Sequence, residues 1–208
     1  LALFPITVAL FCLSDEIALV LLGSGYAPAG SVIRIMALAI FLNLLNQVVN
    51  TQFLALNRPD MLTKVTGLSL LANLVLLLLL VPRTLFGIHL PGLSYQGAAL
   101  ASLGAAICSF ITVRIFINRL TGIRMERRLA RHAASAAVTG VALFILATVV
   151  PATSLIHLAL YLAISYGIFI GILSLIGEFT RDDLFYVGSI LNPGQMREYL
   201  RNELKRRE

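Results

Sequence analysis

Charged residues are scarce in this sequence. Of its 208 residues, 12% are charged and 59% are hydrophobic, whereas a soluble domain carries about 25% charged residues. Apolar runs of about 20 residues recur along the chain, and each is long enough to cross a hydrocarbon core about 30 Å thick. This composition excludes a soluble globular enzyme and predicts an all-α, polytopic membrane protein.

The chain also lacks the residue groupings on which most enzymes and metal sites depend. All ten Asp and Glu lie in predicted loops, interfaces or the tail, so no span offers the carboxylate that usually relays protons or sodium. Cys12 and Cys108 lie in separate apolar runs. His89, His132 and His157 have no Cys or carboxylate at metal-ligand spacing. There is no glycine-rich phosphate loop and no Ser/His/Asp set, so we expect no enzyme activity, no metal and no cofactor.

Apolar runs separated by helix-breaking residues predict about six transmembrane helices in a membrane domain over residues 1–177. The chain starts inside an apolar run, so we expect the first span to be the remnant of a longer one. Residues 17–22 form a short apolar helix, closed by Gly23, that is too short to cross. The predicted spans lie near residues 1–13, 28–56, 61–81, 93–117, 133–150 and 155–176, with a basic connector at 119–132 and a polar, partly helical tail at 178–208.

The basic residues predict the orientation of these spans. If the loop at Arg58 is cytoplasmic, 14 of the 16 Lys and Arg lie on the cytoplasmic side, and Arg34 and Arg83 alone lie outside. This asymmetry accounts for the net charge of +6 without a nucleic-acid partner. We therefore expect a multi-pass protein of the cytoplasmic (plasma) membrane with a cytoplasmic C-terminus.

Small residues recur at every fourth position in three of the predicted spans. Because small side chains let membrane helices approach closely, these rows are expected to be packing seams. They comprise Gly97, Ala101 and Ala105, then Ala133 with Ala137, and Gly167 with Gly171.

The order of several short motifs resembles the polysaccharide (oligosaccharidyl-lipid) flippase family of the multidrug/oligosaccharidyl-lipid/polysaccharide exporter superfamily. Each motif is weak alone, and their order and spacing carry the resemblance over residues 14–110. The matching segments are residues 22–29 (LGSGYAPA), 54–59 (LALNRP), 73–75 (NLV) leading to 81–82 (VP), 97–102 (GAALAS) and 178–183 (EFTRDD). Members of this family have 12 or 14 helices in two lobes around a central cavity. The resemblance implies that this chain is the C-terminal part of such a transporter, with an N-terminal lobe of the same protein as its partner.

Amide side chains in the second predicted span are the leading candidates for substrate contact. Asn43, Asn46, Gln47 and Asn50 follow i, i+3, i+4, i+7 spacing and so share one helix face. Because an unmatched polar group against lipid tails costs several kcal/mol, this face must meet protein or water. It either lines a translocation cavity or forms hydrogen bonds that pack helices together.

Arg34 and Asn73 also belong to the candidate binding set. Arg34 either pairs with the diphosphate of a lipid-linked glycan or extends to outer-leaflet headgroups. Arg114 has the same two interpretations near the inner end of its span. Asn73, a lone amide in the third span, is either a packing contact or a cavity residue.

These observations predict that the chain flips a lipid-linked oligosaccharide across the membrane by alternating access, with that glycan and membrane lipids as its partners. Three alternatives remain at this point. A drug or cation exporter of the same superfamily would share the fold. A membrane-embedded transferase would need acidic metal ligands in its cytoplasmic loops, which are instead rich in Arg. A non-transporting scaffold would keep the amides packed and dry.

Overall fold

The protein is helical, apart from one very short antiparallel ladder. The computed structural model describes residues 3–85, 88–122, 127–150 and 152–177. The elements are α1 (Leu3–Cys12), α2 (Ser14–Leu22), the short 3-10 helix η1 (Ser24–Tyr26), α3 (Ala29–Ala55), α4 (Pro59–Leu80), β1 (Thr84–Leu85), β2 (Ile88–His89), α5 (Ser94–Thr121), α6 (Arg127–Val149) and α7 (Leu155–Leu175).

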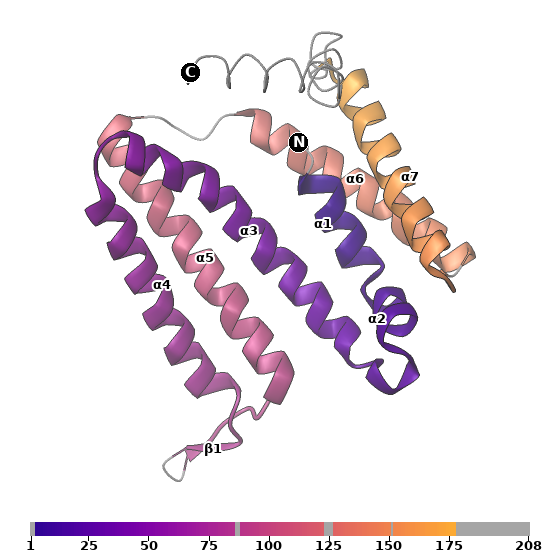
Figure 1. Cartoon of the computed structure of the whole chain (residues 1–208), viewed down its shortest axis with the longest axis horizontal. Helices are drawn as coiled ribbons and strands as arrows, with labels where there is room; N and C mark the ends of the chain where they lie inside the picture. Colours follow the sequence, from indigo (N-terminus) through magenta and orange to yellow (C-terminus); the bar gives the residue numbers. More distant parts are fainter. Residues whose placement is uncertain (1–2, 86–87, 123–126, 151, 178–208) are drawn as a thin grey trace, which may run out of the picture. The chain divides into compact units, whose positions relative to one another are not determined.

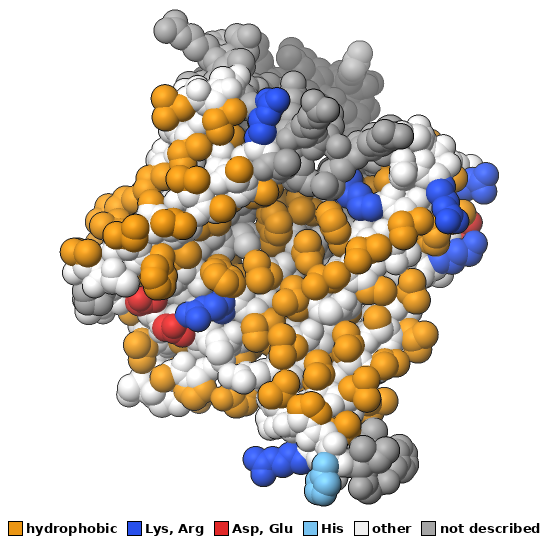
Figure 2. Space-filling model, turned by 180° about the vertical axis from the view of Figure 1, so that it is seen from behind, with side chains coloured by type: hydrophobic (Ala, Val, Ile, Leu, Met, Phe, Trp, Pro, Cys, Tyr) orange, Lys and Arg blue, Asp and Glu red, His pale blue; other side chains and the backbone are white. Residues whose placement is uncertain are grey.

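Five of these helices, α3 to α7, are long and apolar enough to cross a membrane. The first predicted span, residues 1–13, is α1, and the short helix predicted at 17–22 lies within α2; the two helices meet at 75° around Leu13. Apolar side chains cover the outer faces of the helices (Figure 2). They include Leu71 and Phe144, which are 59% and 62% exposed. Such surfaces suit lipid contact, so the fold is compatible with a multi-pass membrane protein.

Local chemistry explains where most helices begin and end. Proline can occupy the first turn of a helix because its missing N–H has no partner there, and Pro59 opens α4 in this way. Gly122 ends α5 with a left-handed φ of 69°. The basic connector predicted over residues 119–132 is shorter than expected, since α5 continues to Thr121 and α6 already begins at Arg127. Arginine is a good helix former, so the basic residues extend the helices.

Helices α3, α4 and α5 pack together. Two hydrogen bonds show that α3 and α5 run parallel. Gln96 of α5 donates to Ser31 near the N-terminal ends of both helices. Asn46 of α3 donates to Ser109 further along both. Helix α4 runs antiparallel to α5 and packs against it (Figure 1). A core of Val49, Phe53, Val65, Val113 and Ile117 fills the space near the α3–α4 turn.

The predicted seam on α5 is confirmed by this packing. Gly97, Ala101 and Ala105 are buried, and the hydroxyl of Ser69 on α4 donates to the Ala105 carbonyl at 3.2 Å. A Cβ added at Gly97 would lie 2.6 Å from the Leu80 carbonyl oxygen. The small residues therefore let α4 approach the α5 backbone closely.

Helix α1 packs against both α3 and α6. Phe4 meets Phe41 of α3 edge to face, with ring centroids 5.0 Å apart. Leu13, Leu143 and Tyr161 form a second buried cluster. The chain divides into two compact units at Tyr166 and Gly167, inside α7, and the described part of the second unit is residues 167–177. The predicted tail at 178–208 lies outside the described residues.

Candidate functional site

The predicted amide stripe of α3 divides into a buried row and an exposed row. Asn46 is 3% exposed, and its Nδ2 donates to the Ser109 hydroxyl of α5 at 3.2 Å. Asn50 is half-buried on the same helix, and Asn43 and Gln47 are exposed. The spacing placed all four residues on one broad face, but α5 covers only one edge of that face.

The buried row, Asn46 and Asn50, has amide oxygens without hydrogen bonds in the described chain. The Oδ1 atoms of Asn46 and Asn50 are buried and accept no hydrogen bond from any described residue. The Oδ1 of Asn73, on α4, is also buried and accepts no hydrogen bond from any described residue. Asn73 makes no hydrogen bond to the amides of α3 within the described part of the chain, so the structure does not join it to their row.

The exposed row runs along α3 with helical spacing. Ile40, Asn43, Gln47, Thr51 and Leu54 succeed one another at intervals of three or four residues, and all are exposed. Asn43 lies near the middle of a helix about 40 Å long, so its amide lies near the centre of this candidate span. Lipid tails cannot satisfy such a group. This row therefore needs either another protein segment or water against it.

The guanidinium of Arg34 binds other side chains of this protein. One guanidinium nitrogen forms an ion pair with Asp15 at 2.5 Å, and Nε donates to the Ser14 hydroxyl at 3.0 Å. The guanidinium also lies 5.9 Å from the centroid of the Phe11 ring. Gly30 contributes a close approach, since a Cβ there would collide with the Asp15 carboxylate. These contacts fasten α3 to the bend between α1 and α2.

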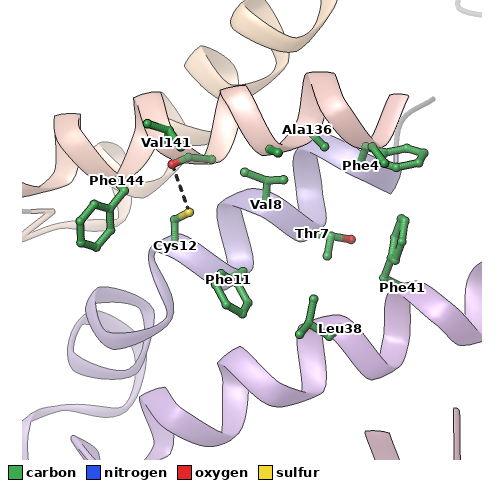
Figure 3. Close-up of a pocket in the computed structure, with 13 residues that line it drawn as sticks. Phe4, Thr7, Val8, Phe11, Cys12, Leu38, Phe41, Ala136, Val141 and Phe144 are labelled. Carbon is green, nitrogen blue, oxygen red and sulfur yellow. Dashed lines mark hydrogen bonds between the residues drawn. The ribbon is translucent and has the colours of Figure 1, made fainter. Parts of the chain in front are cut away.

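A cavity of about 580 Å³ lies along α1, bordered by α3 and α6. Figure 3 shows the rings of Phe4, Phe11 and Phe41 and the Leu38 side chain beside α1. Its lining is almost entirely apolar, and the Thr7 hydroxyl donates to the Leu3 carbonyl of its own helix. This cavity offers nothing to a sugar hydroxyl. No local pattern predicts this cavity, because its walls come from three helices that are not all neighbours in the chain.

The small residues of α6 also have a different setting from the predicted seam. Ala133 and Ala137 line this cavity. At the next position of the row, the thiol of Cys12 donates to the Gly140 carbonyl at 3.5 Å (Figure 3). On α6, Ala133 and Ala137 therefore leave space for the cavity beside α1, whereas Gly140 allows a close contact with α1.

No metal-binding arrangement is found in the described residues, where no three His, Cys, Asp or Glu side chains come together. Compared with known proteins, the chain matches no family model, and no curated protein or solved structure is similar to it at a significant level.

Proposed function

We propose that this chain is part of a transporter that moves a lipid-linked oligosaccharide across the cytoplasmic membrane by alternating access. The observation that carries the proposal is the exposed polar row of α3. Asn43 and Gln47 leave neutral amides uncovered at membrane depth. A headgroup made of hydroxyls needs such donors and acceptors when it leaves water.

The hydrated surface in this proposal is the exposed row, with Asn43, Gln47 and Thr51 facing a cavity between two lobes. The opposite wall belongs to an N-terminal lobe of the same protein, and the C-terminus is cytoplasmic. The helices perform no covalent chemistry. Their role is to replace the hydration of the sugar while its lipid tail stays in the bilayer.

Accessibility to a membrane-impermeant thiol reagent tests the cavity. In a Cys12→Ala, Cys108→Ala background, we expect Asn43→Cys and Gln47→Cys to be labelled in membranes. Leu71→Cys on the exposed face of α4 is the matched control and should stay unlabelled, because it faces lipid. Failure to label either position 43 or 47, in every transport condition, would show that another protein segment packs on the row.

Transport itself is tested in proteoliposomes that hold a polyprenyl-diphosphate-linked oligosaccharide in the inner leaflet. Arrival of the glycan outside is measured by its sensitivity to an added glycosidase. We expect the double variant Asn43→Leu, Gln47→Leu to slow this arrival, and Leu71→Ala to leave it unchanged. A wild-type protein that moves no glycan would refute the proposal.

A further inference from the structure

Arg114 on α5 is a membrane-embedded cation with no counter-charge in the described chain. Ion pairs among the described residues join Arg34 to Asp15 and Lys64 to Asp60, and none involves Arg114. Its Nε atom is buried and has no hydrogen-bond partner among the residues that the structure describes. Since a charge inside the membrane normally pairs with another charge or with a polar group, this guanidinium needs a partner from elsewhere.

The side chain of Arg114 does not extend toward the nearer end of its helix. Arg114 lies about two turns before Thr121, the last residue of α5, or roughly 10 Å along the axis. Its guanidinium carbon lies 5.2 Å from the centroid of the Phe110 ring, one turn further from that end. Helical side chains point toward the N-terminus, and the Phe110 ring holds this one in that direction. The charge is therefore kept inside the span, and an anion must approach it.

We infer that Arg114 binds the phosphate of a lipid that enters from the side of the α3–α4 loop. That end of α5 also carries Arg119, and Arg58 lies in the facing loop. These basic residues attract anionic headgroups to this end of the helices. A guanidinium pairs with two phosphate oxygens at once, and a phosphate supplies the missing acceptors. Any bilayer phospholipid and any lipid-linked diphosphate carry this group. The inference does not depend on the proposed transport, because binding is measured without any flipping step.

The test uses the full chain in a phosphate-free maltoside detergent, with lipid adducts counted by native mass spectrometry. The probes are phosphatidylglycerol, a polyprenyl diphosphate and, as a phosphate-free control, diacylglycerol. We expect Arg114→Gln to raise the Kd on the order of tenfold for at least one of the two phosphate lipids. An effect on phosphatidylglycerol identifies a bilayer lipid, whereas an effect restricted to the diphosphate identifies a carrier lipid.

Two further variants serve as controls for the effect of Arg114→Gln on lipid binding. Arg83→Gln removes an exposed charge in the loop at the opposite end of α4 and should change neither Kd by more than about twofold. Arg114→Lys keeps the charge and loses the two-pronged geometry, so its Kd should lie between those of wild type and Arg114→Gln. Unchanged binding of both phosphate lipids by Arg114→Gln would overturn the assignment. If that variant fails to fold, unchanged binding by Arg114→Lys would do the same.

Discussion

The close contact between α4 and α5 at Gly97 makes a sharp prediction about stability. A Cβ at this position would lie 2.6 Å from the carbonyl oxygen of Leu80 and 2.9 Å from its carbonyl carbon. That carbonyl is at the end of α4 and accepts a hydrogen bond from the Leu93 N–H at 2.9 Å. Gly97→Ala therefore forces the helices apart or displaces the hydrogen-bonded carbonyl.

The magnitude follows from two opposing terms. Overpacking a well-packed site costs about 1–3 kcal/mol, while replacing glycine by alanine in a helix gains about 1 kcal/mol. Gly67→Ala on α4 is the matched control, because a Cβ there would meet nothing within 4 Å. Both variants gain the same helix propensity. The difference in their free energies of unfolding, about 1–3 kcal/mol, therefore isolates the α4–α5 contact.

The assay is unfolding of the reconstituted chain in mixed micelles by increasing fractions of SDS, followed by circular dichroism. We expect Gly67→Ala to be more stable than wild type and Gly97→Ala to be less stable than Gly67→Ala. Equal stability of the two variants would refute the reasoning, since it would mean that α4 does not pack against α5 at Gly97.

Three further predictions use the same unfolding assay. A double-mutant cycle of Arg34→Gln and Asp15→Asn should give a coupling free energy of about 0.5–1 kcal/mol, because both side chains are partly exposed; strict additivity would contradict the ion pair. Phe53→Ala should lower the free energy of unfolding by about 3 kcal/mol, since this ring is fully buried, whereas Leu54→Ala, at 56% exposure, should change it by less than about 0.5 kcal/mol. Asn46→Ala should cost about 0.6 kcal/mol through the lost hydrogen bond to α5, and an unchanged stability would exclude that bond.

Much of the fold was predictable because membrane helices are determined locally. In hydrocarbon every backbone N–H and C=O group needs a hydrogen bond within its own segment. Apolar runs of about 20 residues therefore form helices. The span predicted at 61–81 is α4, Pro59–Leu80, and the span at 155–176 is α7, Leu155–Leu175. The first predicted span, 1–13, is α1, Leu3–Cys12, and the short helix predicted at 17–22 lies within α2, Ser14–Leu22. The 75° angle between them was not predictable, because packing sets this angle and no local pattern encodes it.

The sequence could not predict which amides of the candidate site are buried. Helical spacing placed the four amides Asn43, Asn46, Gln47 and Asn50 on one face about 100° wide, but it does not say where on that face a neighbouring helix packs. Whether each amide is buried depends on where α5 crosses α3, and that crossing buries Asn46 while leaving Asn43 exposed. The sequence by itself determined the helices and the presence of a polar face. Only the tertiary structure decided which amides remain open, that Arg34 meets Asp15, and that Arg114 has no counter-charge among the described residues, because contacts between helices depend on how distant segments pack.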